Sequence, residues 1–412
     1  MDVIIIGGGI GGLTLALALH RKGIPCRVFE AAPEVKPLGV GINLLPHAVR
    51  ELASLGLSER LAACSVETQE VCFYTRHGQL VDQEPRGRFA GYEWPQISIH
   101  RADLHRVLLD TVIERLGPDA VTLDHRCVRT EQNGKGITAF FVDHAGQALP
   151  PVAGSVAIAC DGLHSAVRAQ MHPDEPPPIE HVTMSYRGVT RWPAFLTGSS
   201  MVYVGTYDTG KLVIYPIRDN VDAEGRQLIN WVIEIVKKGD QVQDWGRAAS
   251  IDDCIGPFED WTFDWLDIPA LIRASDRIIP YPNLDRNPLP YWSVERLTLL
   301  GDAAHPMLPR GSNGAAQAIL DATALAGLLD DEKDPVVALK RYEAMRLPAT
   351  ANVVLTNRER SPDAILRVVE QRTGGKPFAH IDDVISREEI SEWQENYRKV
   401  AGFQRNTQDT AR

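Results

Sequence analysis

The sequence predicts a mixed α/β protein that combines a parallel sheet, an antiparallel sheet and a helical C-terminal region. Three patterns indicate this fold class: a strand–turn–helix–strand unit at the N-terminus, a run of strands with alternating apolar residues between residues 184 and 236, and a helical periodicity after residue 330. A chain of 412 residues usually forms two or more modules. We therefore expect the two sheets to belong to different, interleaved domains.

The N-terminal unit begins with the apolar strand VIII at residues 3–6, and a helical stretch at residues 13–19 follows a glycine-rich turn. This helix is expected to end near Gly23, and the next strand, CRVFE, covers residues 26–30. A strand, a helix and a second strand in this order form a βαβ unit of a Rossmann-like sheet. Because glycines break the apolar run and no basic segment precedes it, it predicts neither a signal peptide nor a membrane span.

The turn of this unit carries the spacing Gly7-x-Gly9-x-x-Gly12, which is typical of dinucleotide-binding proteins. One glycine permits the sharp turn, one lets a pyrophosphate approach the backbone, and one allows close packing of the helix, whose free N–H groups face the phosphates. Glu30, at the end of the second strand, stands where a carboxylate binds the ribose of an adenosine. The turn predicts a bound NAD or FAD and does not choose between them.

Two later strands end in a pair of an acid and a glycine. The strand SVAIAC runs into Asp161 and Gly162, and the strand LTLL runs into Gly301 and Asp302. A single Asp at a strand end more often caps the next turn. The two pairs together, downstream of the glycine turn, favour a cofactor site.

In order and spacing, GGGIGG (7–12), the Asp161-Gly162 motif and GDAAHPMLP (301–309) resemble a known family, the single-component FAD-dependent aromatic hydroxylases. These are also called class A flavoprotein monooxygenases, of the para-hydroxybenzoate hydroxylase fold. The segments 38–57, 96–104 and 311–322 are similar to its bacterial branch of phenazine-carboxylate (5-methylphenazine-1-carboxylate) monooxygenases. The resemblance selects FAD as the cofactor and points to the size and ring type of the substrate.

The resemblance also implies a domain organisation. A discontinuous FAD-binding domain of the glutathione reductase type would comprise residues 1–70, 101–180 and 270–330. An interleaved substrate-binding sheet domain would comprise residues 71–100 and 181–269, followed by a helical region at residues 331–412.

For the cofactor site, the resemblance implies that Glu30 binds the adenosine ribose, Arg101 neutralises the pyrophosphate and Asp302 holds the ribityl chain. Asp161 and Gly162 would serve both FAD and the pyridine nucleotide. Arg101 precedes a predicted helix at 102–116, where the helix dipole disfavours a cation unless an anion shares the site. The expected cofactor-binding residues are Gly7, Gly9, Ile10, Gly11, Gly12, Glu30, Val40, Arg101, Val128, Asp161, Gly162, Asp302, Gly311, Gly314 and Ala315.

The loop after Asp302 is expected to cradle the flavin. Pro309, Arg310 and Gly311 would lie against the ring, with Pro309 and Arg310 as catalytic candidates, and a helix starting at Gly314 would aim its N–H groups at the pyrimidine edge. Reduced flavin is negatively charged there, so fixed N–H donors stabilise it. For Arg310, which could also meet an acidic substrate, a solvated loop arginine is an equal alternative.

The substrate-binding sheet is predicted from alternating strands at residues 184–190, 201–207, 211–217 and 228–236. Residues 70–76 and 95–100 are expected to feed the same sheet or its connection. Tyr203 and Tyr207 share one face of their strand and are substrate candidates, although packing roles are the alternative. No general base is evident, His305 is expected to be structural, and a tyrosine proton relay is unsupported.

The function implied by the resemblance is hydroxylation of an aromatic or N-heteroaromatic acid, with NADH or NADPH and O2, through a flavin C4a-hydroperoxide. Carboxylate binding by Arg310 or Arg187 is plausible on charge alone. The alternatives are a reductase, a halogenase, or a flavin-binding protein without turnover. A halogenase is disfavoured because no Lys occurs between Lys36 and Lys135 and residues 265–269 do not fit its WxWxIP motif.

Composition limits the partners. The net charge of −11 argues against general binding of nucleic acid or anionic lipid, which leaves small molecules. The six cysteines are scattered without metal-ligand spacing, so no metal site is expected, and a reduced, cytoplasmic monomer or homodimer is the default. Residues 388–400 predict a last amphipathic helix, and the tail from residue 406 is expected to be disordered.

Overall fold

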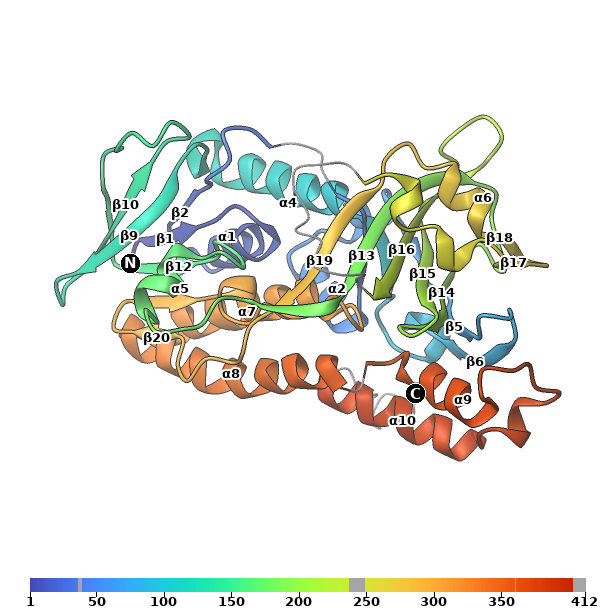
Figure 1. Cartoon of the computed structure of the whole chain (residues 1–412). Helices are drawn as coiled ribbons and strands as arrows, with labels where there is room; N and C mark the ends of the chain where they lie inside the picture. Colours follow the sequence, from blue (N-terminus) through green and yellow to red (C-terminus); the bar gives the residue numbers. More distant parts are fainter. Residues whose placement is uncertain (36–38, 237–248, 360, 403–412) are drawn as a thin grey trace.

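The computed structural model describes residues 1–35, 39–236, 249–359 and 361–402. It contains a parallel sheet near the N-terminus and a larger, mainly antiparallel sheet beside it (Figure 1). The long helix α8 (Pro335–Glu359) runs along one side, from the parallel sheet toward the C-terminal helices near the larger sheet (Figure 1). This confirms the predicted mixed α/β class with two sheets and a helical C-terminal region.

The parallel sheet has the strand order β20-β21-β12-β1-β2-β8, and only the edge strand β20 is antiparallel to its neighbour. Ile5 lies between Val28 and Ile158 in the register. All four residues of β1 are buried, as expected of a central strand covered on both faces. The strands are β1 (Val3–Ile6), β2 (Cys26–Phe29), β8 (Val121–Thr122), β12 (Val156–Ala159), β20 (Ser293–Val294) and β21 (Leu297–Leu299).

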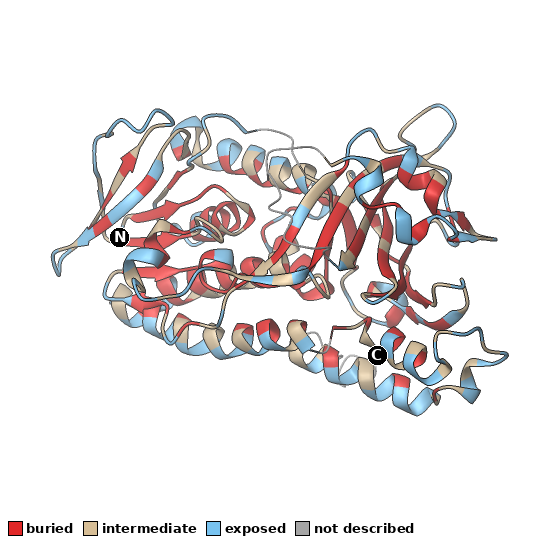
Figure 2. Cartoon of the chain, in the orientation of Figure 1, coloured by how far each residue is buried: buried red, intermediate tan, exposed pale blue. Residues whose placement is uncertain are grey.

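Helix α1 (Ile10–Arg21) packs against α7 (Asn313–Asp331) and α4 (Arg101–Leu116). The approach to α7 requires small residues, because a Cβ on Gly11 would lie 3.4 Å from Cβ of Ala318. Buried residues fill the space between these helices and the parallel sheet (Figure 2). The remaining helices before α7 are α2 (Pro46–Ser54), α3 (Ser58–Ala62), α5 (Ala166–Met171) and α6 (Ile268–Arg273).

The larger sheet has the order β19-β13-β16-β15-β14-β5-β6, and only β14 and β5 run parallel to each other. All four strands predicted between residues 184 and 236 lie in it, and residues 70–76 join it as β5. Its strands are β5 (Glu70–Tyr74), β6 (Leu80–Pro85), β13 (Ile179–Trp192), β14 (Ser200–Thr206), β15 (Gly210–Arg218), β16 (Gln227–Val236) and β19 (Ile279–Asp285).

The second early segment, residues 95–100, does not pair with the larger sheet. It forms β7 (Ile97–His100) between β3 (Gly41–Leu44) and β4 (Ser65–Glu67), in a small antiparallel sheet that packs against β15. Of the two expected places for this segment, the same sheet or its connection, the first was wrong, because a period of two predicts which face a residue occupies and not which strand is its neighbour. The other small sheets contain β9 (Arg126–Gln132), β10 (Ile137–Val142) and β11 (Val152–Gly154), and β17 (Thr262–Phe263) and β18 (Leu266–Asp267).

The two faces of the larger sheet pack against different helices. On one face Val202 and Val204 pack with α6, whereas on the other Met201 and Tyr203 pack with the C-terminal helices. These are α9 (Ala364–Thr373) and α10 (Arg387–Ala401), which confirms the helix predicted at 388–400. The tail from residue 406 lies outside the described residues.

None of the helices in the described parts of the chain combines the length and apolarity that crossing a bilayer requires.

The glycine turn allows a test of packing. Replacing Gly12 by Ala is expected to lower the free energy of unfolding by about 1–3 kcal/mol, because its Cβ would lie 2.0 Å from the carbonyl oxygen of Gly7. Gly9→Ala is the matched control, since no atom lies within 4 Å of that Cβ position; its expected cost is below about 1 kcal/mol. Urea unfolding of the FAD-free chain measures both, and equal stabilities would mean that the turn relaxes around a methyl group.

Candidate functional site

A cavity of about 360 Å³ lies between the glycine turn, the loop after β21 and the larger sheet. Its wall includes the start of α1, the start of α4 and residues from β13, β14, β15 and β16. The structure thus brings together segments that are far apart in the sequence. The predicted site residues that line this cavity are Gly9, Ile10, Gly11, Val40, Arg101, Gly162, Tyr203, Asp302, Pro309, Arg310, Gly311, Gly314 and Ala315.

Gly7 and Gly12 do not line the cavity, and both are packing positions. Gly7 has a φ of +110°, and a Cβ there would lie 2.4 Å from the carbonyl oxygen of Cys160 on the neighbouring chain segment. By contrast, Cβ positions on Gly9, Gly162 and Gly314 meet no atom within 4 Å. These three glycines leave open space on the cavity side, which fits a phosphate group and a flat ring that approach the backbone closely.

Glu30 and Asp161 stand beside the glycine turn and are held by backbone N–H groups. Glu30 accepts hydrogen bonds from Gly8 N at 2.7 Å and Ala32 N at 2.9 Å. Asp161 accepts one from Ala166 N at 3.0 Å through Oδ2, whereas its buried Oδ1 has no partner. Burial raises the pKa of Asp161.

Val128 lies apart from the cavity. It sits on β9, in a different sheet, and its side chain is exposed. Its contact with the cofactor stays a prediction.

Arg101 and Asp302 face the cavity from opposite chain segments. Helix α4 begins at Arg101, one residue before the predicted start, and Arg101 N donates to Val40 O at 2.9 Å. The Arg101 guanidinium has no hydrogen-bonded carboxylate within the described parts of the chain. The Asp302 side chain is open to the cavity. The surrounding protein still removes water from the carboxylate, and this desolvation raises the pKa of Asp302, an effect that His305 and Arg101 partly offset.

A buried carboxylate anchors the corner after β21. Oδ2 of Asp321 on α7 lies 2.5 Å from Nε2 of His305 and accepts from Gly301 N at 3.2 Å, while Oδ1 accepts from Arg346 Nε at 2.7 Å. Burial alone would raise the pKa of Asp321, but His305 and Arg346 lower it to about 2. His305 is therefore held in a structural contact, as expected from the sequence.

Beyond this anchor the chain makes a tight turn into α7. Gly311 and Ser312 both have a φ of 61°, in the left-handed region, and the helix begins at Asn313, one residue before the predicted start. A non-glycine residue with positive φ is uncommon and needs support from its surroundings. The first residues of α7, Asn313, Gly314 and Ala315, line the cavity, and the N–H groups of a first helical turn have no partner within the helix.

Arg310 is neither free nor a solvated loop arginine. Its Nη1 donates to the carbonyls of Asn357 at 2.9 Å and Arg358 at 3.3 Å, at the C-terminal end of α8, where a cation is favoured. Its guanidinium also stacks over the ring of Tyr207, 4.6 Å from the centroid. Tyr207 itself does not line the cavity; its ring packs against the guanidinium of Arg310, which does.

A buried charge cluster, missed in the sequence, lies in the wall of the cavity. Nζ of Lys211 lies 2.8 Å from Asp363 and 3.6 Å from Glu234, and it donates to Tyr207 Oη at 2.7 Å. Burial would lower the pKa of Lys211, but Asp363, Glu234 and Tyr207 raise it above its usual value. Charged residues inside apolar strands were the available signal, since Lys211 and Glu234 face each other on β15 and β16.

Arg187 on β13 is another cation in the wall of the cavity. It lines the cavity and stacks over Tyr281, with the guanidinium carbon 4.4 Å from the ring centroid. Its Nε is buried without a hydrogen-bond partner, and no carboxylate pairs with its guanidinium in the regions that the structure describes. Tyr203 lines the same cavity and stacks on Phe73, and burial raises its pKa.

Comparisons with known proteins identify the family of the chain. Residues 1–356 match the family model of an FAD binding domain. The chain is 44% identical over 393 residues to a phenazine 1,6-dicarboxylic acid hydroxylase of Lysobacter antibioticus, covering 93% of this chain and 95% of that one. It is 32% identical over 374 residues to a 3-hydroxybenzoate 6-hydroxylase of Polaromonas naphthalenivorans, covering 87% of each chain.

Among solved structures, a similar fold is found in Klebsiella pneumoniae HpxO complexed with FAD and uric acid. The TM-score is 0.75, with 24% sequence identity and coverage of 98% of this chain and 95% of that chain. The cavity, the glycine turn and these matches assign the chain to the class A flavin monooxygenases, as an FAD-dependent aromatic hydroxylase.

Proposed function

We propose that this hydroxylase acts on a carboxylated aromatic or N-heteroaromatic ring whose carboxylate binds Arg187, with NADH or NADPH and O2 as co-substrates. The observation that carries the proposal is the charge of the cavity wall. Lys211 is neutralised by two carboxylates, and Arg310 is held by two carbonyls, whereas Arg187 has an unpartnered buried Nε. A buried donor without a partner is costly, so an anionic ligand group would be favoured there.

The names of the relatives support this substrate class. Both the phenazine 1,6-dicarboxylic acid hydroxylase and the 3-hydroxybenzoate 6-hydroxylase are named for aromatic acids. Tyr203 and Met201 on β14 give the cavity an apolar wall suited to a flat ring. We propose a phenazine-like or smaller aromatic acid, with Tyr203 contacting the ring and Arg187 its carboxylate.

We propose the following cofactor contacts. Glu30 accepts from the adenosine ribose, Arg101 neutralises the pyrophosphate over the N-terminus of α1, and Asp302 accepts from the ribityl hydroxyls. Pro309 and Gly311 lie against the flavin ring, and the first turn of α7 faces its pyrimidine edge. When bound, the flavin supplies hydride acceptance and oxygen activation. The fixed N–H groups of α7 would stabilise negative charge at the ring edge.

The division of the chain into domains is also proposed. Separate apolar clusters around the parallel sheet and the two faces of the larger sheet support an FAD-binding domain and a substrate-binding sheet domain. The pairing of β7 with β3 and β4 favours moving residues 97–100 to the junction between the two.

Hydroxylation is tested by oxidation of NADH and of NADPH in air, with phenazine, quinoline, pyridine and benzoate acids and mass spectrometry of each product. Substrate-stimulated oxidation with a mass gain of one oxygen atom is expected. A reductase would give products without added oxygen. A flavin-binding protein without turnover would show pyridine-nucleotide oxidation that none of these acids stimulates.

The carboxylate contact is tested by Arg187→Leu. The dissociation constant of an aromatic acid should rise by about 10- to 150-fold, because a hydrogen bond to a charged group is lost. The binding of the corresponding neutral amide should change much less. Perturbation of the flavin absorption spectrum measures both affinities in the FAD-loaded protein.

Arg191→Leu is the matched control, since Arg191 lies on the same strand but is exposed and pairs with the surface residue Asp276. An acid-to-amide affinity ratio in Arg187→Leu that equals the ratio in Arg191→Leu would contradict carboxylate binding by Arg187.

The ribityl contact is tested by Asp302→Ala. Loss of a charged acceptor should raise the dissociation constant for FAD by about 10-fold or more. Asp330→Ala, which removes an exposed acid paired with Lys22, should leave FAD binding unchanged. Equal flavin occupancy of the two variants in a fluorescence titration would place the ribityl chain elsewhere.

A further inference from the structure

The last helix, α10, reaches the turn that faces the flavin. Tyr397 on α10 is buried, and its hydroxyl accepts a hydrogen bond from Asn313 Nδ2 at 2.7 Å and donates one to Asn357 Oδ1 at 3.1 Å. Asn313 is the first residue of α7, and Asn357 is near the end of α8. One hydroxyl therefore joins three helices at the start of α7.

The same hydroxyl also packs directly against the backbone of the turn at Gly311. A Cβ on Gly311 would lie 1.6 Å from Tyr397 Oη, so the hydroxyl occupies the space beside this glycine. The side-chain Nδ2 of Asn357 donates to Leu308 O at 3.4 Å, and the backbone carbonyl of Asn357 accepts from Arg310 Nη1 at 2.9 Å. The residues on both sides of Pro309 are thus tied to the Tyr397 and Asn357 pair.

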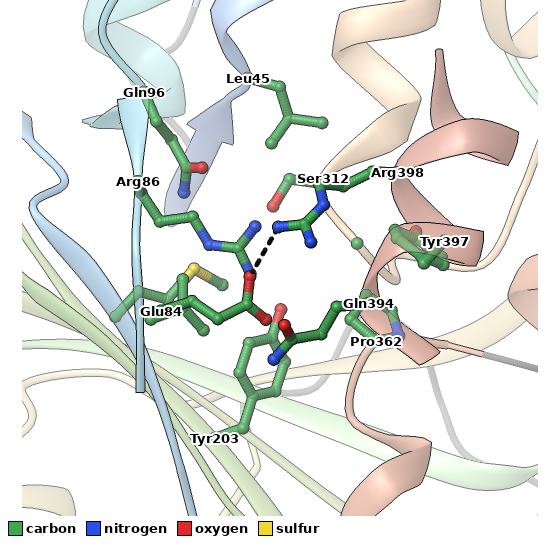
Figure 3. A pocket seen from close by; sticks show the side chains of 13 residues that line it. Leu45, Glu84, Arg86, Gln96, Tyr203, Ser312, Pro362, Gln394, Tyr397 and Arg398 are labelled. Carbon is green, nitrogen blue, oxygen red and sulfur yellow. Dashed lines mark hydrogen bonds and ion pairs between the residues drawn. The ribbon is translucent and has the colours of Figure 1, made fainter. Parts of the chain in front are cut away.

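A small cavity lies beside the turn on the side of α10. Its volume is about 40 Å³, with room for only a few water molecules, and it lies between Ser312, the larger sheet and α10. Figure 3 shows Ser312 and Tyr397 at this cavity, with Glu84 and Tyr203 across from α10. Atoms at a cavity lose packing contacts. Beside this cavity, the Tyr397 hydroxyl supports the turn by packing against Gly311 and by its hydrogen bonds to Asn313 and Asn357.

We propose that Tyr397 is a positioning residue for the flavin. By fixing the turn and the Asn313 side chain, it keeps the first N–H groups of α7 aligned with the pyrimidine edge of the ring. The inference rests on the proposed placement of the flavin against residues 309–314. It extends the flavin site to residues 357 and 397, which lie beyond the family match at 1–356.

Loosening the turn weakens the binding of reduced FAD more than that of oxidised FAD, because the N–H groups of α7 stabilise the negative charge of reduced flavin. In Tyr397→Phe, the affinity ratio of reduced to oxidised FAD should fall by about 3- to 10-fold. For a two-electron couple this fall is a midpoint potential lower by about 15–30 mV. The ring of Tyr397 is retained, so the packing of α10 should persist.

The experiment measures the midpoint potential, the visible absorption spectrum and the thermal unfolding temperature of the FAD-loaded protein. Tyr291→Phe is the matched control, since it removes a hydroxyl that donates to Met171 O away from the turn. A potential that falls in Tyr397→Phe and not in Tyr291→Phe supports the proposal. Equal potentials in these two variants overturn it.

A second variant, Asn313→Ala, tests the route of the effect. If Tyr397 acts through the side-chain amide of Asn313, the double variant Tyr397→Phe with Asn313→Ala should shift the potential no further than Asn313→Ala alone. Additive shifts would overturn the proposed route. The potential needs no aromatic substrate. A lowered potential in an enzyme that hydroxylates none of the acids would refute the proposed substrate class and leave the role of Tyr397 intact.

Discussion

The site depends on one buried carboxylate, that of Asp321. It holds the backbone of Gly301, the ring of His305 and the guanidinium of Arg346, so β21, α7 and α8 meet around a single charge. A buried charge is tolerated only when it is paired and hydrogen-bonded. With this anchor, the residues after β21 can leave the parallel sheet and form the tight turn at Gly311 and Ser312.

The proposed substrate class rests on the distribution of charge around the cavity. Several cations come close to it, and the fold engages two of them internally: Lys211 with Asp363 and Glu234, and Arg310 with the end of α8. Arg101 and Arg187 are left without a hydrogen-bonded carboxylate in the described segments. They lie at the two ends of the proposed ligand arrangement, where a pyrophosphate and a substrate carboxylate would be bound.

Local patterns were enough to predict the strands of the N-terminal unit, the four strands between residues 184 and 236 and, within one residue, the start of α7. Each of these depends on residues that are neighbours in sequence. The partner of β7 and the cluster around Lys211 depend on strand register and tertiary contacts, which a single sequence does not display. The sequence named both Arg310 and Arg187 as possible partners of a carboxylate and singled out Arg310 for its place in the loop after Asp302. The contacts of Arg310 with the end of α8 could not be predicted, because they are tertiary. Tyr397 carried no signal, since its role arises from the packing of α10 on the turn.

The most direct test of the account is a crystal structure of the chain with FAD and an aromatic acid. The flavin ring should lie against Pro309 and Gly311, and the acid's carboxylate oxygens should lie about 2.7–2.9 Å from the guanidinium of Arg187. A carboxylate bound instead by Arg310 or Lys211, with Arg187 still unpartnered, would contradict the proposed contact of Arg187 with the substrate.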